Sequence, residues 1–140
     1  EVEQRVSDAV SQLSQGVSPL VYSAQGPDDP AVTGFDATAQ AAGYTREAAA
    51  RKVGETLAEI MRQILDRSIV RRIVVAGGDS SGAVASHLGI TALTVASGLT
   101  PGAPLCKAWS NQASRDGLEI ALKGGQLGAV SFYGNVRDGC

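Results

Sequence analysis

The sequence of 140 residues is poor in the side chains that build metal centres and disulfide frameworks. Its two cysteines, Cys106 and Cys140, are too few for a disulfide scaffold or a cysteine-rich zinc site, and its single histidine, His87, excludes a centre with several histidines. No apolar run approaches the roughly 18 residues that a membrane-spanning helix needs. The sequence therefore predicts a chain with no metal centre, no disulfide framework and no membrane span.

Neither sign of charge is in large excess. Twelve Lys and Arg residues against fourteen Asp and Glu residues give a net charge of −2, which argues against non-specific binding to nucleic acid or to a membrane surface. Apolar residues make up 44% of the chain, a share typical of a globular domain. Because the chain begins directly on a helical pattern, without a Met or a leader, we expect residues 1–140 to be one domain of a longer cytoplasmic protein.

Glycine, in contrast, is abundant and clustered. The chain holds 17 glycines among 140 residues, above the usual share of about 7%. Two clusters stand out, one over residues 77–82 and one over residues 124–128. Glycine without a repeat marks either tight turns or a close approach of the backbone to a ligand.

Apolar periodicity predicts two long helices. One covers residues 2–13 and ends near Gly16, and the other runs from an N-cap at Thr45 to about Arg67. Between them, residues 19–23 predict a short strand, followed by a loop that continues to about residue 43.

The remaining chain predicts alternating strands and helices. We expect strands over residues 73–76, 91–96 and 118–123, a short helix over 83–88, a loop over 97–116, and a last helix around Phe132 and Tyr133. This alternation favours a single three-layer α/β domain with a mostly parallel sheet and flanking helices.

The first glycine cluster lies between a predicted strand and a predicted helix. In such a unit the loop N–H groups and the positive helix N-terminus can bind an anion, and the hydroxyls of Ser80 and Ser81 can donate to phosphate oxygens. The spacing matches neither the P-loop nor the dinucleotide fingerprint. A tight turn capped by Asp79, Ser80 or Ser81 explains the same residues, and the sequence leaves both interpretations open.

The second glycine cluster follows the strand that ends at Lys123. Loops at the carboxyl ends of parallel strands lie at one edge of a sheet, so we expect both glycine clusters and the Ser23 loop to meet there. Lys123 could pair with a phosphate there, although a solvated lysine on an alternating strand is the favoured interpretation.

Other polar and aromatic residues have ordinary explanations as well. Asp28 and Asp29 could hold Mg²⁺, but turn chemistry is favoured for two aspartates flanked by prolines. For Trp109, packing onto the core is favoured over stacking on a base. His87 is interpreted as structural and Cys106 as a small, inert apolar residue.

Four motifs together resemble one known family, the four-carbon acid sugar kinases. VAGGDSSGAV at residues 75–84 resembles the family's GG(E/D)TSGAV, and LKGGQLG at 122–128 resembles its LKSGNFG. LVYS at 20–23 with GPDD at 26–29 is similar to the segment that opens its nucleotide-binding half, and PGAP at 101–104 follows in the expected place. The order and rough spacing agree over nearly the whole chain.

The resemblance implies that residues 1–140 are the C-terminal, ATP-binding α/β domain of a two-domain kinase. The family phosphorylates a hydroxyl of erythronate, threonate or 3-oxo-tetronate type acids with ATP and Mg²⁺. The N-terminal domain, absent here, binds the sugar acid and holds the expected base, so we expect the isolated chain to be inactive. The resemblance leaves a homo-oligomer open. The nucleotide site carried over comprises Ser23, Gly77, Gly78, Asp79, Ser80 and Gly125, with Ser81 and Gly82 shaping the loop and Lys123 beside it.

The sequence also departs from the family pattern. Gly124 replaces a serine and so removes a hydroxyl, while Gln126 and Leu127 replace Asn and Phe. These changes motivate an alternative function, a diverged, non-catalytic ligand-binding module of the same fold. A dinucleotide- or acyl-CoA-binding domain is a third hypothesis, which the missing fingerprint disfavours.

Overall fold

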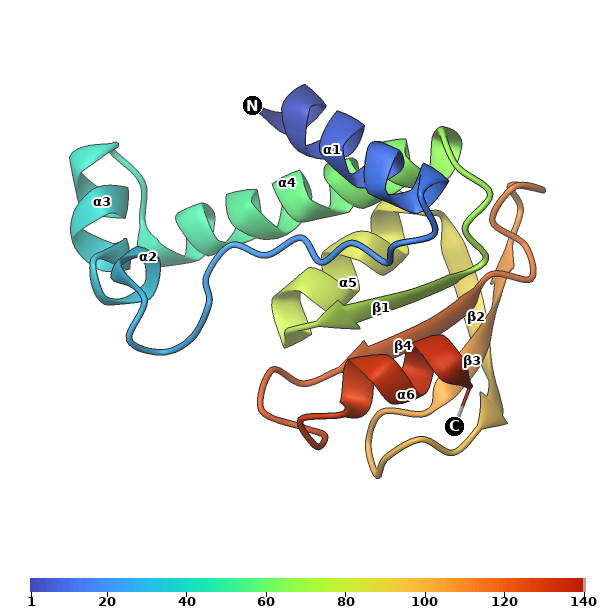
Figure 1. The fold of residues 1–140 in the computed structure, drawn as a ribbon. Coiled ribbons are helices and arrows are strands. Elements are labelled where there is room, and N and C mark those ends of the chain that lie inside the picture. The colour runs from blue at the N-terminus through green and yellow to red at the C-terminus, as the bar shows by residue number, and fades with distance from the viewer. Residues whose placement is uncertain (140) are drawn as a thin grey trace.

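A four-stranded sheet separates two helical layers in the computed structural model, which describes residues 1–139 (Figure 1). The strands lie in the order β1-β4-β3-β2, and they span Arg72–Ala76 (β1), Glu119–Lys123 (β4), Leu105–Ser110 (β3) and Ile90–Ser97 (β2). Helices α4 and α5 cover one face of the sheet and α6 covers the other. The predicted α/β domain with flanking helices is therefore confirmed.

The prediction of a mostly parallel sheet is wrong, because the sheet is mixed. Only β1 and β4 run parallel, whereas β4 with β3 and β3 with β2 are antiparallel. The cause is β3, which lies inside the loop expected over residues 97–116. Its Leu105, Cys106 and Ala108 side chains are buried, so burial places this strand in the sheet despite the prolines before it.

Two helices confirm the long helical predictions. Helix α1 spans Val2–Ser14 and α4 spans Arg46–Asp66, with the Thr45 hydroxyl accepting a hydrogen bond from the Ala48 N–H at 3.2 Å. Gly16 follows the C-cap Gln15 of α1, and its φ of +77° is the left-handed conformation that glycine adopts without strain. One face of α4 buries Ala58 and Leu65 against the sheet, and another buries Ile64 against α1.

The segment between α1 and α4 differs from its prediction. Residues 19–23 were expected to form a strand, but they belong to no strand and run as an extended segment alongside α4 (Figure 1). Its apolar side chains Leu20, Val21 and Tyr22 are exposed and line cavities that α4 and β1 also border. The expected loop after it contains two short helices, α2 over Pro30–Thr33 and α3 over Phe35–Ala41.

Helices α5 and α6 complete the hydrophobic cores on the two faces of the sheet. Helix α5 spans Gly78–His87 and packs closely on α4, where a Cβ added at Gly54 would lie 3.5 Å from the Ala83 Cβ. Helix α6 spans Phe132–Asp138, which confirms the predicted last helix, and it buries Phe132 and Val136 on the opposite face of the sheet. No helix within residues 1–139 is long and apolar enough to span a membrane.

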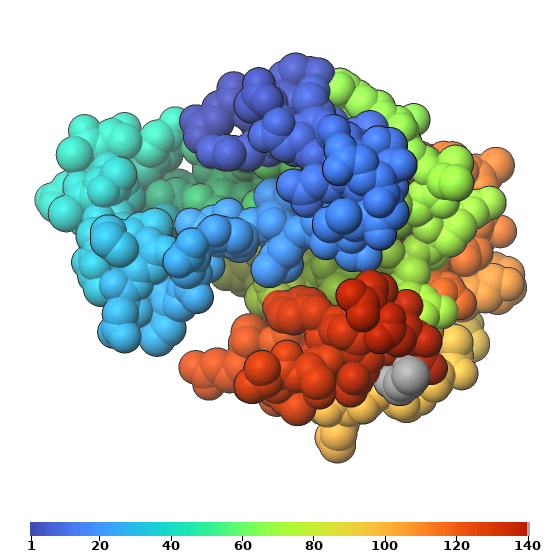
Figure 2. All heavy atoms as spheres, viewed as in Figure 1, coloured from blue at the N-terminus to red at the C-terminus, as the bar shows by residue number. Residues whose placement is uncertain are grey.

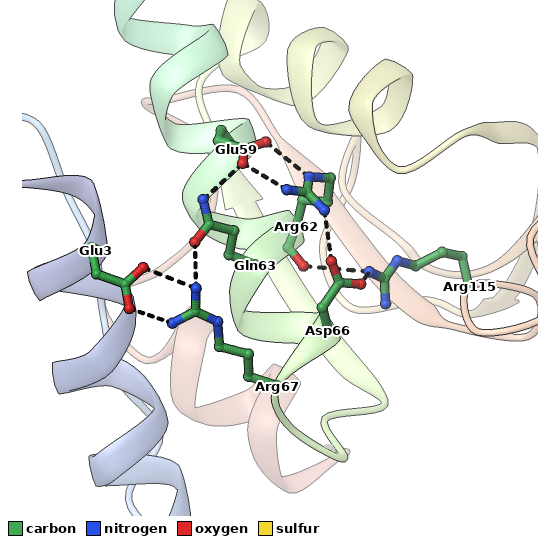
Figure 3. Close-up of polar contacts among 7 residues, drawn as sticks. All are labelled: Glu3, Glu59, Arg62, Gln63, Asp66, Arg67 and Arg115. Atoms are coloured by element: carbon green, nitrogen blue, oxygen red, sulfur yellow. Dashed lines mark hydrogen bonds and ion pairs between the residues drawn. The ribbon is translucent and has the colours of Figure 1, made fainter.

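An ion-pair network joins the C-terminal half of α4 to α1 and to the loop before β4 (Figure 3). The Arg115 side chain is 4% exposed, pairs with Asp66 and donates to the Arg62 carbonyl at 3.3 Å, while its Nε has no partner among residues 1–139. Hydrogen bonds from the side chains of Arg62 and Gln63 lower the pKa of Glu59 to about 2, and the bond from Arg62 has the larger effect. The network fixes the end of the sheet where β1 and β4 begin.

Candidate nucleotide site

The two glycine clusters begin side by side at one edge of the sheet. Ala76 lies opposite Lys123 in the parallel β1–β4 pair, and the next residue, Gly77, donates its N–H to the Lys123 carbonyl at 2.9 Å. The β2–β3 hairpin loop reaches the same edge, where a Cβ added at Gly102 would lie 3.3 Å from Leu127. The expectation that the two glycine clusters meet at one edge of the sheet is therefore confirmed.

The first cluster is mostly helix, which corrects the predicted loop over residues 77–82. Gly77 alone forms the turn, with φ of +112° and ψ of 132°, a conformation open only to glycine, and α5 starts at Gly78. No side chain caps this helix, so the capped-turn interpretation is wrong, and Ser81 Oγ instead donates to the Gly77 carbonyl at 2.7 Å. The start of α5 is thus left without a side-chain acceptor.

Three backbone N–H groups at the start of α5 remain unpaired. Those of Gly78, Asp79 and Ser80 have no acceptor among residues 1–139, and the first backbone bond of the helix is the one from Ser81 to Gly77. Together with the helix dipole they make this end of α5 electropositive. A Cβ added at Gly78 would meet nothing within 4 Å, so the fold itself does not require a glycine there.

The second cluster forms a β-turn over residues 124–127. The Leu127 N–H closes it by donating to the Gly124 carbonyl at 3.1 Å. Gly125, in the centre of the turn, has an ordinary backbone conformation and open space where a Cβ would lie. Like Gly78, it leaves room for a ligand without being needed by the fold.

Lys123 is not the solvated lysine that its alternating strand suggested. It is 6% exposed, and its Nζ donates to the Gly124 and Gly125 carbonyls at 3.1 and 2.9 Å. The interpretation failed because β4 is an inner strand, covered on both faces, where alternation no longer separates buried from exposed positions.

Ser23 faces the first cluster across a cavity of about 530 Å³. This cavity is lined by Ser23, Ser80, Ala76 and Tyr133 together with apolar side chains of residues 20–22 and of α4, and its volume lies in the range of ligand pockets. In Figure 2 the surface is hollowed between the blue residues near 25–30 and the orange-red residues near 125. Asp79 and Gly82 instead line a groove of about 660 Å³ between α4 and α5.

The remaining candidates lie outside this arrangement. Asp29 accepts from the Gln25 and Ala31 N–H groups at 2.7 and 2.8 Å, which lower its pKa and confirm the turn interpretation. Trp109 is 44% exposed near the far end of β3, so the prediction that it packs onto the core is wrong. His87 Nδ1 lies 3.1 Å from the Ala83 carbonyl, and burial raises the pKa of the Cys106 thiol. Cys140 lies outside the described residues.

Sequence reasoning found the edge but missed part of what lies there. Neither the free N–H of Gln126 nor the Tyr133 ring in the cavity was predicted. No sequence signal places the Tyr133 ring in the cavity, because its position depends on where α6 packs. The free N–H of Gln126 could have been read from the turn, since the central N–H groups of a β-turn take no part in its closing hydrogen bond.

Comparisons with known proteins identify the family to which the chain belongs. Residues 1–133 match the model of the nucleotide-binding C-terminal domain. The chain is 62% identical over 139 residues to a 3-oxo-isoapionate kinase of Paraburkholderia graminis, covering 99% of the chain and 30% of the relative. It is 37% identical over 133 residues to a 3-oxo-tetronate kinase of Burkholderia multivorans, covering 94% of the chain and 28% of that protein.

A solved structure shares the fold. Haemophilus influenzae protein HI1011, of the DUF1537 family, superposes with a TM-score of 0.69 at 24% identity, over 99% of this chain and 33% of that one. The chain thus spans about a third of the length of the proteins it matches. The match over residues 1–133 shows that the chain belongs to the nucleotide-binding C-terminal domain family, as its resemblance to the four-carbon acid sugar kinases predicted.

Proposed function

We propose that this chain is the ATP-binding half of a kinase that phosphorylates a hydroxyl of a four-carbon or similar sugar acid. The observation that carries the proposal is the pair of glycine segments joined by the Gly77–Lys123 hydrogen bond of 2.9 Å. Unpaired N–H groups on both segments border one edge of the sheet beside the Ser23 cavity. Names of relatives, 3-oxo-isoapionate kinase and 3-oxo-tetronate kinase, support the substrate class.

The nucleotide phosphates would bind at the start of α5. Gly78, Asp79 and Ser80 offer their N–H groups there, and the Ser80 side chain lies in the same cavity as Ser23. Phosphoryl transfer depends mainly on positioning the phosphates and neutralising their charge, which backbone donors and a helix N-terminus can supply. Apolar side chains of residues 20–22 and α4 would then surround the nucleoside.

The acidic residues fit a magnesium ion held mostly by the nucleotide. Within residues 1–139, no cluster of three or more His, Cys, Asp or Glu side chains is placed to hold a metal. Mg²⁺ usually keeps several waters and binds one or two carboxylates together with substrate phosphates. Asp79, in the first turn of α5, makes no hydrogen bond or ion pair within residues 1–139 and is one carboxylate available for this role, although it lines the groove between α4 and α5 and not the Ser23 cavity.

The sugar acid and the base that accepts its proton would come from an N-terminal domain outside this chain. Relatives are about three times as long as the chain, which covers 30% of one and 28% of another. We therefore expect the 140-residue chain to bind ATP in the cytoplasm without phosphorylating a sugar acid by itself. Phosphorylation of 3-oxo-tetronate by the isolated chain would contradict this division of labour.

A thermal titration tests the nucleotide site. ATP with Mg²⁺ at 100 times its dissociation constant should stabilise the chain by about 2.7 kcal/mol, or roughly 8 °C at about 3 °C per kcal/mol. NAD at the same concentration should give no comparable shift. Gly125→Asp places a carboxylate beside the bound phosphates without a clash in the fold, so it should abolish the shift and leave the ligand-free melting temperature unchanged.

The alternative function, a non-catalytic module, rests on the departures in the second glycine segment. Leu127 stands where the family has Phe, and its side chain contacts the Gly102 and Gly124 positions. Such a module would show no shift up to millimolar ATP while keeping the same fold. A shift with NAD alone would favour the dinucleotide-binding hypothesis instead.

A further inference from the structure

Lys123 is a buried cation without an acidic partner. Its side chain ends under the 124–127 turn, where Nζ donates to two backbone carbonyls, those of Gly124 at 3.1 Å and Gly125 at 2.9 Å. It forms no ion pair with any carboxylate among residues 1–139. Burying a charge is costly unless hydrogen bonds compensate it, so this arrangement needs a structural or functional reason.

Two aromatic rings of α6 also contact the Lys123 ammonium group. The ring centroids of Phe132 and Tyr133 lie 5.8 and 5.9 Å from Nζ, within the range of cation–π attraction. Phe132 is buried in the core beneath the sheet. The turn is therefore tied through Lys123 to helix α6 and not only to its own strand.

These bonds set the direction of two peptide groups. In a trans peptide the C=O of one residue and the N–H of the next point in opposite directions. Because the Gly124 and Gly125 carbonyls point at Nζ, the N–H groups of Gly125 and Gln126 point away from it. Neither N–H has an acceptor among residues 1–139. Two adjacent free N–H groups on one side of a turn form an anion-binding nest.

The main chain of Lys123 joins this nest to the start of α5. Its carbonyl accepts the Gly77 N–H at 2.9 Å, so one residue holds the first glycine segment through its backbone and the second through its side chain. Free N–H groups at residues 78–80 and at residues 125–126 are thereby kept in a fixed relation.

We propose that Lys123 is a positioning residue, which orients the Gly125 and Gln126 N–H groups toward the nucleotide phosphates and does not bind the phosphates itself. This inference rests on the proposed function. It differs from the direct Lys123–phosphate contact that the sequence analysis gave as the less favoured interpretation, because such a contact would require Nζ to leave two carbonyls and a site that is 6% exposed.

The first test needs no nucleotide. Lys123→Met keeps the apolar stem and removes the ammonium, so the backbone order parameters of Gly125 and Gln126, measured by ¹⁵N relaxation, should fall from about 0.85 to below about 0.6. Lys107→Met is the matched control, because Lys107 is exposed on β3 and its Nζ lies over the Trp109 ring, 5.0 Å from the centroid. Unchanged order in the Lys123→Met turn would overturn the proposal.

The second test separates phosphate binding from general damage to the fold. Lys123→Met should bind ATP about tenfold more weakly, about 1.4 kcal/mol, and bind adenosine within twofold of the parent chain. Equal losses for ATP and adenosine, or no loss for ATP, would contradict a role in orienting the phosphate nest. Lys107→Met should change neither affinity.

A third measurement uses the unaltered chain and does not depend on whether a variant folds. ATP should move the amide signals of Gly125 and Gln126 and leave the Lys123 ammonium signal in place. A shifted ammonium signal with unmoved amides would mean that Lys123 binds the phosphate itself. If the unaltered chain binds no ATP at all, the proposed function fails, while the order parameters still decide whether Lys123 holds the turn.

Discussion

The two ends of the sheet differ in how completely their polar groups are paired. Where β1 and β4 begin, charged side chains pair with one another: Arg72 with Glu119 at 2.6 Å, and Arg115 with Asp66. Where the same strands end, the polar groups are backbone N–H groups at residues 78–80 and 125–126, and they have no acceptor in the described chain. Within residues 1–139, the first end leaves the buried Arg115 Nε without a partner, whereas the second end leaves five backbone N–H groups without an acceptor, and the proposed function assigns these groups to a ligand.

Two kinds of glycine can be distinguished in the chain. At Gly16, which follows the C-cap of α1, at Gly117, before β4, and at Gly77, before α5, a positive φ of 77°, 80° and 112° requires glycine for the fold. Gly78 and Gly125 have ordinary φ values and empty space where a Cβ would lie. The fold does not require glycine at these two positions, and both lie in the segments that carry the unpaired N–H groups, where the proposed function places the nucleotide phosphates.

The largest expected effect is on the stability of the fold, from a substitution at the end of the sheet where β1 and β4 begin, here called the paired end. Arg115→Ala removes a buried side chain together with its hydrogen bond to the Arg62 carbonyl and its ion pair with Asp66, which should lower the free energy of unfolding by about 2 kcal/mol. Urea unfolding measures this loss. The ATP dissociation constant should stay within twofold, and a larger change would mean that the two ends are coupled.

A substitution at the opposite end, where β1 and β4 finish and which is here called the unpaired end, should weaken ATP binding without lowering stability. Gly78→Ala adds a methyl group in open space at the start of α5, so we expect unchanged or slightly higher stability and about tenfold weaker ATP binding. Gly134→Ala, in α6, is the matched control, because its Cβ also meets nothing within 4 Å. It should raise stability by up to about 1 kcal/mol with no effect on ATP. Equal ATP affinities for the two variants would remove the distinction drawn between the glycines.

The smallest expected effect is a pH dependence at the paired end. Hydrogen bonds from Arg62 and Gln63 hold the folded-state pKa of Glu59 at about 2, below its unfolded value of 4.5, so the unfolded chain takes up the proton first as pH falls. The contribution of Glu59 is therefore present above pH 4.5 and lost as pH falls toward 2. Because the Glu59 side chain is 36% exposed, we expect less than about 1 kcal/mol.

Comparing the parent chain with Glu59→Gln isolates this contribution. The difference in unfolding free energy should be largest near neutral pH and vanish near pH 2. A difference that grows on acidification would show that the sign is wrong.

The elements that could be predicted are those whose signals are local. The Thr45 cap, the periodicity of α4 and the β-branched residues of β1 are each contained in a few neighbouring residues, and each prediction is confirmed. The edge where both glycine segments meet could also be predicted, because it needs only that two strands be parallel.

The errors arose where long-range contacts decide the structure. Residues 19–23 have the composition of a strand but pair with no strand and leave Leu20, Val21 and Tyr22 exposed, whereas β3 forms despite the nearby Pro101 and Pro104. Helix α5 starts inside the glycine cluster because glycine can be helical when the helix packs on α4 and the sheet. Lys123 could not be read from its strand, because its partners are carbonyls of a turn and rings of α6.

Amide hydrogen exchange with and without ATP and Mg²⁺ tests the central claim most directly. Unpaired N–H groups exchange quickly, so the account predicts that ATP slows exchange at residues 78–80 and 125–126 and leaves the paired end around Arg115 unchanged. Protection confined to the groove between α4 and α5, or to the Arg115 end, with none in the two glycine segments would contradict it.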